Sequence, residues 1–352
     1  MAFTFSMKDT YRQSVEAASG GKQTVRYDNK GIPSVMNIIP QLTYKDVGLG
    51  SSTAPLPAFV INGKNVDQLY IGTYMATVHD GRAYSLPGQV PKVYTDHDQA
   101  VALCRAKGDG WHCMTNAEYA AIALWCKANG YYPRGNNNYG SDVSAPHERC
   151  RPGTKGSDGR TNLGLTGSGP SSWTHDGTPN GIYGLNGDAW EWSTGLRIVN
   201  GEIQILVDNN AALPTADFTV GSAQWKAILQ NGTPVVPGTA DTLKYSTVSG
   251  KPTISTVLGT PVASSCAFKD IAVGAGITIP DVLKGLALYP SDNSDHGGDS
   301  FYVDNTQAER LFFRGGSWDG TSAAGVFALN GGGPRSNSYD GLGFRVAFAD
   351  VL

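Results

Sequence analysis

Residues 315–345 read GGSWDGTSAAGVFALNGGGPRSNSYDGLGFR. Both ends of this stretch, GGSW and GFR, join apolar strand-like segments, whereas the centre is mostly small or polar and carries almost no charge. Large apolar side chains leave water, so we expect six of them to anchor the stretch and the strand after it in the core. These are Trp318, Val326, Phe327, Leu329, Phe344 and Val346. The residues between them would then face solvent, where substitution costs little stability.

The composition excludes several classes of protein. The chain has 352 residues and a formal net charge of -3 with no basic block, so nucleic-acid binding is not expected. Charged residues make up only 16%, and 45 glycines favour turns and short strands. No run approaches the roughly 18 apolar residues that cross a bilayer. The N-terminal MAFTFSMKDTYRQS lacks the apolar centre of a signal peptide, so we expect synthesis in a cytoplasm without membrane insertion.

Changes in composition divide the chain. Residues 1–50 are polar and irregular, and are interpreted as an N-terminal attachment or oligomerisation segment, with a surface-hugging lead-in as the equal alternative. Residues 51–352 would form the ligand-binding domain. The stretch 208–306, rich in Ser, Thr, Gly and Pro, is interpreted as an insertion in that domain. The Gly, Asn and Ser stretch 135–180 predicts ordered loops.

Local signals predict both strands and helices. Asn-Gly pairs at 62–63 and 200–201, each between two β-prone runs, predict hairpins. ERLFFRGGSW and GLGFRVAFADVL are typical of closing strands. The predicted fold class is therefore α+β, with short irregular antiparallel sheets, two helices and long ordered loops.

The two helices are predicted from their capping signals. Thr95 and Asp98 would open the first helix. Thr115 and Glu118 form a capping-box pattern at the start of the second helix, which Asn-Gly at 129–130 would end.

Motifs with a fixed chemistry are missing from the sequence. GxSxG, GxGxxG, the P-loop and HExxH do not occur. His97 and His112 could each be a ligand or a base, but a structural role is favoured. Asp292, Asp295 and Asp299 could hold a hard cation through oxygen ligands. Their spacing is not that of an EF-hand, so a solvated loop is favoured.

Two further pairs are interpreted as structural. Asp188 and Glu191 lie in GDAWEW, where alternating aromatic residues in a strand favour the core over a carboxylate site. The five cysteines form no CxxC, which argues against a zinc site and against a complete disulfide framework. Cys104 and Cys113 could be a redox pair, but two buried thiols are favoured.

Four segments, taken in order, resemble the formylglycine-generating-enzyme branch of the C-type lectin fold. They are AVALCRAKGDGWHCMTNAEYAAIALW, GIYGLNGDAWEW, LFFRGGSW and GLGFRVAF. The resemblance covers about residues 58–352 and implies two helices, a central tryptophan-bearing strand and the closing strands of a compact irregular sheet.

The same resemblance bears on chemistry. The enzymatic members act through cysteines just before GFR, and residues 319–341 contain none, which argues against a formylglycine-generating-type oxidase. A calcium-holding Asp or Asn of the family falls on Gly184, and neither an EPN nor a QPD motif occurs. No cofactor is expected, with calcium left open.

Within this fold, the frame GGSW, GVF, LN, PRSNS and GFR is similar to that of the variable proteins of diversity-generating retroelements, especially phage tropism determinants. In that family, codons of this segment are rewritten at template adenines, and AAC codons become NNC. NNC cannot encode Lys, Glu, Gln, Trp or Met, and residues 319–341 contain none of these. The resemblance implies the following diversified, ligand-binding residues: Asp319, Gly320, Ala323, Ala328, Asn330, Gly332, Gly333, Asn337, Tyr339, Asp340 and Gly341.

The resemblance therefore implies a phage receptor-binding, tropism-determining protein without enzymatic activity. It would lie in the virion, at the tail or tail fibre tip, and would bind a protein or glycan on the bacterial surface. Tail components and further copies of the chain, with a trimer favoured, would be its other partners. The alternatives are the oxidase and a purely structural virion or adhesin module.

Overall fold

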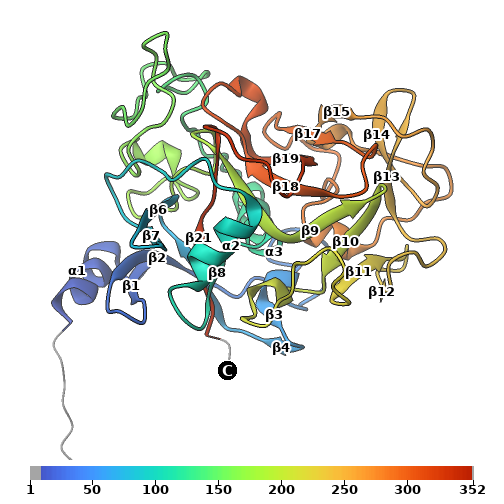
Figure 1. Ribbon diagram of the computed structural model, residues 1–352, viewed down its shortest axis with the longest axis horizontal. Coiled ribbons are helices and arrows are strands. Elements are labelled where there is room, and N and C mark those ends of the chain that lie inside the picture. The colour runs from blue at the N-terminus through green and yellow to red at the C-terminus, as the bar shows by residue number, and fades with distance from the viewer. Residues whose placement is uncertain (1–8, 351–352) are drawn as a thin grey trace, which may run out of the picture.

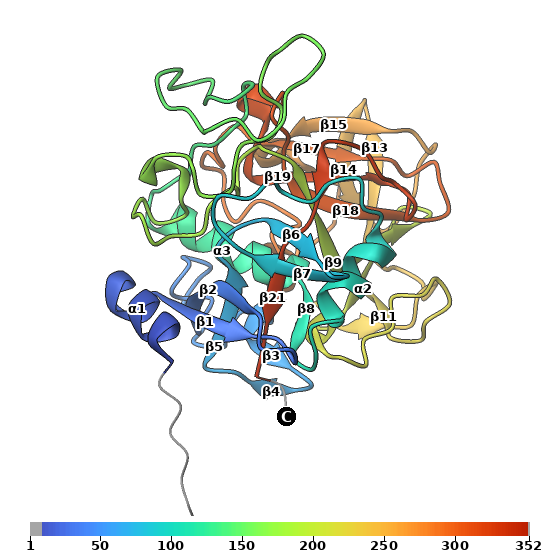
Figure 2. The ribbon, with the colours of Figure 1, turned by 60° about the vertical axis from the view of Figure 1, so that its left-hand side comes forward.

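A computed structural model describes residues 9–350 (Figures 1 and 2). Residues 1–8, the start of the predicted attachment segment, and residues 351–352, the end of the predicted domain, lie outside the described residues. The described chain combines few helices with many short strands. The predicted α+β class is confirmed at this level.

The smaller of the two main sheets places the last strand of the chain among strands from its first third. Its order is β1–β2–β5–β21–β8, and every neighbouring pair is antiparallel. Figure 2 shows β21, coloured red, beside the green β8. The bounds are Gln23–Tyr27 for β1, Pro33–Pro40 for β2, Gln68–Gly72 for β5, Val346–Phe348 for β21 and Trp111–Cys113 for β8.

The N-terminal segment is regular, so the prediction of an irregular stretch is wrong for its described part. Helix α1 spans Thr10–Ser19, and β1 and β2 join the smaller sheet. Val25, Val35 and Met36 are buried on these two strands. Polar residues surround these apolar ones in the sequence, so the two strands could not be recognised from composition. Which side chains of a strand are buried depends on the strands it pairs with. A role in attachment or oligomerisation stays a prediction.

The larger sheet has twelve strands and carries the central tryptophan-bearing strand, β9 (Figure 1). Its main path runs β15–β17–β19–β18–β9–β10–β13–β14–β16, with β11 and β12 attached at β10 and β20 attached at β9. The pairs β17–β19, β14–β16 and β20–β9 are parallel. The bounds are β9 Trp190–Val199, β10 Glu202–Leu206, β11 Trp225–Ile228, β12 Pro234–Val235, β13 Lys244–Val248, β14 Lys251–Ser255, β15 Ser264–Ala267, β16 Ala272–Val273, β17 Ser300–Val303, β18 Arg310–Gly315, β19 Gly325–Gly333 and β20 Leu342–Gly343.

Residues 208–306 contribute strands β11 to β17 to this sheet. Their buried side chains Tyr245, Phe268 and Phe301 belong to the same core cluster as Leu196 and Leu329. The stretch therefore shares the core of the rest of the chain. That it is an insertion relative to the resembled family stays a prediction.

Both predicted hairpins are confirmed. The turns at 62–63 and 200–201 join β3 to β4 and β9 to β10. Positive φ at both central residues of each turn, 51° and 69° in the first and 48° and 78° in the second, is what a type I′ turn requires of Asn-Gly. A third hairpin, turning at 80–81, was not predicted. The bounds are β3 Val60–Ile61, β4 Lys64–Asn65, β6 Ala76–His79 and β7 Arg82–Ser85.

The two predicted helices are present with one correction. Helix α3, Asn116–Ala128, begins with the expected capping box of Thr115 and Glu118 and ends at the expected Asn129. Helix α2, His97–Arg105, is capped by Asp96 and not by Thr95, because the Asp96 carboxylate accepts the Gln99 amide at 2.8 Å. A shorter helix, α4, spans Asp281–Gly285. Single 3₁₀ turns are η1 Pro57–Phe59, η2 Ser171–Trp173, η3 Asn210–Ala212, η4 Phe268–Asp270 and η5 Thr321–Ala323.

The long stretch 135–180 consists of ordered loops, as predicted. Apart from η2 it contains isolated β-bridges and turns, drawn in green at the top of Figure 1. In the described part of the chain, no helix is long and apolar enough to cross a membrane.

A buried ion pair connects the two sheets. Arg345, in the GFR motif, donates to both carboxylate oxygens of Glu191 on β9, at 2.9 and 2.6 Å. It also donates to the carbonyl oxygens of Gly72, at the end of β5, and Tyr183. Both charged side chains are almost inaccessible to solvent. The guanidinium therefore holds β9 of the larger sheet and β5 of the smaller sheet at a fixed separation.

We predict that Arg345→Met lowers the free energy of unfolding by about 3–5 kcal/mol, because the Glu191 carboxylate would stay buried without a counter-ion. Arg12→Met is the matched control, since Arg12 is half exposed and pairs only weakly with Asp9 and Glu16 on α1. It should cost less than about 1 kcal/mol. Urea denaturation measures both values. Equal losses in the two variants would contradict the structural role of the buried pair.

Candidate functional site

The segment 315–345 is not a single loop, because strand β19 forms its centre. It leaves β18 at Gly315, forms η5, crosses the larger sheet as the nine-residue β19, and returns through residues 334–341 to β20. Strand β19 lies between β17 and β18. All six side chains predicted to anchor it are buried, with exposed fractions from 0% to 7%. The predicted core of the segment is confirmed.

Main-chain hydrogen bonds attach the parts of the segment outside β19 to other elements. The donors and acceptors come from residues 94–97, 136–139 and 188–190, which are far from the segment in the sequence. Because these bonds use peptide groups, they do not depend on which side chains the segment carries. The bonds run from Trp318 N to Asp188 O, Tyr139 N to Trp318 O, Thr321 N to Asn137 O, Tyr94 N to Tyr339 O, His97 N to Arg335 O and Trp190 N to Gly341 O, at 2.8–3.2 Å.

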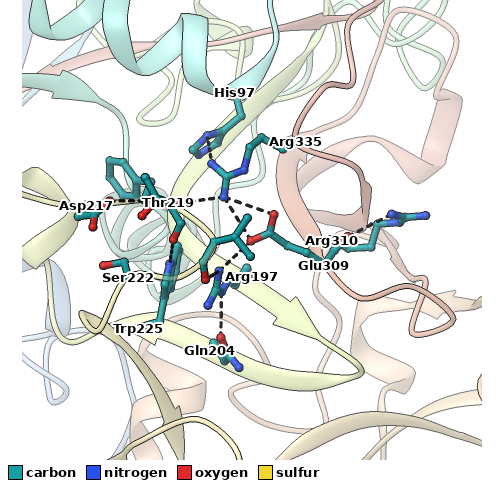
Figure 3. Close-up of polar contacts among 12 residues, drawn as sticks. His97, Arg197, Gln204, Asp217, Thr219, Ser222, Trp225, Glu309, Arg310 and Arg335 are labelled. Atoms are coloured by element: carbon teal, nitrogen blue, oxygen red, sulfur yellow. Dashed lines mark hydrogen bonds and ion pairs between the residues drawn. The ribbon is translucent and has the colours of Figure 1, made fainter.

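Arg335, in the PRSNS motif, supplies the main side-chain attachment (Figure 3). Its guanidinium donates to Asp98 on α2 at 2.7 Å, to Glu309 at 3.2 Å and to the carbonyl oxygen of Phe218 at 2.8 Å. Glu309 also accepts from Arg197 on β9 at 2.8 Å. The loop that follows β19 is thereby bonded to α2, to the loop 215–220 and to β9.

The predicted ligand-binding residues differ in exposure, and three of them are buried. Asp319, Ala323 and Asp340 are exposed, whereas Gly320, Asn330, Gly332, Asn337 and Tyr339 are half-buried. Ala328, Gly333 and Gly341 are buried, so the expectation that they face solvent is wrong. Alternation along β19 accounts for Gly333, which lies on the opposite face from the half-buried residues 330 and 332. Ala328 shares the face of residues 330 and 332 but is fully covered by its neighbours.

Packing also restricts the glycines of β19. A Cβ atom at Gly333 would lie 2.6 Å from the ring of Phe313 and 3.2 Å from that of Trp192. At Gly332 it would lie 2.5 Å from the ring of the half-buried Tyr302. Residue 333 therefore requires glycine, and residue 332 accepts a side chain only if Tyr302 moves.

The other side chains considered in the sequence have structural surroundings. His97 packs edge-on against Trp192 and Phe218, with ring centroids 5.6 and 5.7 Å away. His112 bonds Glu118 at 2.8 Å and is buried. These contacts agree with the structural role that the sequence favoured for both histidines.

The acidic residues 292, 295 and 299 do not form one site. Asp292 pairs with Lys127 at 2.6 Å, and Asp295 is exposed. Asp299 is buried, where it accepts the amide of Phe327 at 2.6 Å, and burial raises the pKa of its carboxyl group. Among residues 9–350 no group of three or more His, Cys, Asp or Glu side chains is placed to hold a metal ion.

The two remaining pairs, Cys104 with Cys113 and Asp188 with Glu191, are buried or half-buried, in agreement with a structural role. Cys104 and Cys113 are buried free thiols. Glu191 bonds Arg345, as described above. Asp188 is half-buried and accepts hydrogen bonds from the Gly164 amide and the Asn136 side chain, both at 2.8 Å.

Several residues beside the segment were missed in the sequence analysis. Tyr94 is 61% exposed and has a φ of 55°, an uncommon conformation for a bulky residue. Asp96, Asp98 and Ser336 line one shallow hollow together with Arg335. No local sequence signal marks these residues, because Asp98 and Arg335 meet across 237 positions of chain.

The chain was compared with known proteins at three levels. No protein-family model matches it, and no curated protein matches its sequence. Among solved structures it is similar to the Major Tropism Determinant U1 Variant, with 12% sequence identity and a TM-score of 0.33, over 93% of this chain and 71% of that chain. A TM-score of this size does not establish a common fold, so the proposals below depend on this chain's own residues and contacts.

The exposure pattern predicts which positions tolerate change. We expect Ala323→Tyr to alter the free energy of unfolding by less than about 0.5 kcal/mol, because Ala323 faces solvent. The same substitution at the buried Ala328 should cost at least about 1–3 kcal/mol through overpacking. Chemical denaturation distinguishes the two variants, and similar losses at both positions would refute the assigned exposure.

A second prediction concerns Asp188, whose carbonyl oxygen accepts the Trp318 amide at 3.1 Å. Removal from water raises the pKa of Asp188 to about 6. The folded state then binds more protons than the unfolded state between pH 4 and 6, so stability falls as pH rises through that window. Asp188→Asn should remove this fall in the free energy of unfolding, which is at most about 3 kcal/mol. The fall is smaller to the extent that water reaches the half-buried carboxylate. Thermal unfolding from pH 4 to 8 measures it, and identical pH profiles for both proteins would contradict the assignment.

Proposed function

We propose that this chain is a phage receptor-binding protein that recognises a bacterial surface molecule through the solvent-facing side chains of residues 319–341. One observation carries the proposal. The main chain of this segment is held by peptide hydrogen bonds from other elements, and its apolar side chains are buried. The exposed side chains can therefore differ between copies while the frame persists.

The finer assignment belongs to the same proposal. The order of the four motifs supports a C-type lectin fold of the formylglycine-generating-enzyme branch, and the frame around 319–341 supports a variable protein of a diversity-generating retroelement. The contact surface would centre on Asp319, Ala323 and Asp340, which are exposed, with the half-buried Asn337 and Tyr339 beside them.

Such a surface is small. A standard protein interface buries roughly 800 Å² on each partner, and a few exposed side chains cover less than this. Attachment of several copies to one virion would raise the overall affinity by a factor of about 10² to 10⁴ without new contacts. We therefore propose a homo-oligomer, with a trimer favoured, in the phage tail, where the other partners are tail components. The receptor would be a protein or a glycan.

The test replaces two side chains of the proposed surface. Tyr339→Ala with Asp340→Ala should reduce adsorption of assembled virions to host cells by at least about tenfold, the effect of losing about 1.4 kcal/mol of binding free energy. The control combines Tyr11→Ala on α1 with Asp241→Ala, two exposed residues on other elements. Unchanged adsorption of the surface variant would refute receptor recognition. Failed virion assembly would instead favour a purely structural module.

A further inference from the structure

A pocket of about 320 Å³ opens between β2, α3 and the loop that follows η2. This volume lies at the lower end of the roughly 300–1,000 Å³ that small-molecule sites occupy. Its walls are mainly apolar and include Ile39, Leu42, Ile122 and Trp125. His175 completes the lining, and we call this cavity the His175 pocket. None of its lining residues belongs to the segment 315–345.

The His175 ring offers one hydrogen-bond donor to the pocket. The side chain is 8% exposed, and its Nδ1 atom accepts the amide of Ile182 at 2.9 Å. This bond places the ring proton of the neutral imidazole on Nε2. Burial lowers the pKa of His175 to about 4, so the ring is neutral at pH 7. Nε2 has no hydrogen-bond partner among the described residues and is not one of their fully buried atoms, so this donor is open to a ligand in the pocket.

The charged groups at the entrance neutralise one another. Lys22 donates to Asp176 at 2.8 Å, and Asp176 also accepts from the amide and hydroxyl of Thr178. Asn37 also makes hydrogen bonds within the protein, because it donates to the carbonyl oxygen of Asn180 and accepts from the hydroxyl of Thr73. The pocket thus presents a mainly apolar interior and the Nε2 donor of His175, with no unpaired charge. A charged ligand would lose its hydration without gaining a counter-ion.

Trp125 gives the pocket a flat wall. Its ring is half-buried and lies 5.2 Å from the His175 ring, at an interplanar angle of 48°. Aromatic faces favour planar apolar groups at such separations.

We propose that the His175 pocket binds a small uncharged molecule that places a planar apolar group against Trp125 and one acceptor oxygen at Nε2 of His175. This site is separate from the proposed receptor surface, and it stands or falls independently of that proposal.

The probe is acetophenone, an aromatic ring with one carbonyl oxygen. Ethylbenzene, of similar size and without the acceptor, is the matched ligand control. Titration of the full chain is followed by ¹H–¹⁵N NMR at the indole N–H of Trp125 and the amide of Ile182. We expect saturable shifts of both signals with acetophenone and an affinity roughly tenfold lower for ethylbenzene, as expected for one lost hydrogen bond.

Two variants complete the test. His175→Asn keeps an acceptor near the position of Nδ1 and removes the Nε2 donor, so acetophenone affinity should fall to that of ethylbenzene. Leu42→Trp fills the cavity and should abolish the shifts with both probes. Thermal unfolding confirms that each variant is folded. The proposal is overturned if neither probe gives saturable shifts in the unchanged protein, or if acetophenone binds His175→Asn as tightly as it binds the unchanged protein.

Discussion

The contact between Arg345 and Glu191 is the interaction on which the rest of the structure depends. A buried guanidinium that donates to a buried carboxylate and to two carbonyl oxygens satisfies all of these groups at once, and each would be costly to leave unpaired. Glu191 lies on β9, which pairs with β18, and Arg345 directly precedes β21. The same contact therefore fixes both ends of the segment 315–345.

The segment between these ends divides into two kinds of position. Residues 325–329 of β19 are all buried, and Phe268 and His296 pack against the ring of Phe327. Exposed positions occur at Asp319, in η5 and in the loop between β19 and β20. Peptide hydrogen bonds and Arg335 hold that loop, so its shape is set by groups other than the exposed side chains. This division between a fixed interior and a replaceable exterior is the physical basis of the proposed function.

Sequence reasoning succeeded where the signal is local. Asn-Gly turns, the capping box at Thr115 and the apolar anchors such as Phe327 depend on neighbouring residues, and all were predicted. It failed where tertiary contacts decide. The pairing of β1 with β2, the burial of Ala328 and the position of Tyr94 beside Tyr339 follow from chain segments that meet only in the folded protein. The His175 pocket is a further example, since its walls come from three distant stretches of sequence.

Amide hydrogen exchange, with and without host-cell envelope fragments, tests the central claim most directly. The claim is that a rigid frame presents the exposed part of residues 319–341 to a receptor. Exchange at Tyr94, Tyr139 and Trp190, whose amides bond the segment, should be slow in the free protein, since these amides are locked in folded structure. Envelope fragments should then slow amide exchange at residues 319–323 and 336–341, while exchange at Tyr94, Tyr139 and Trp190 should stay the same. Two results would contradict the account. One is protection by envelope fragments that is confined to other parts of the chain, and the other is rapid exchange at the amides of Tyr94, Tyr139 and Trp190 in the free protein.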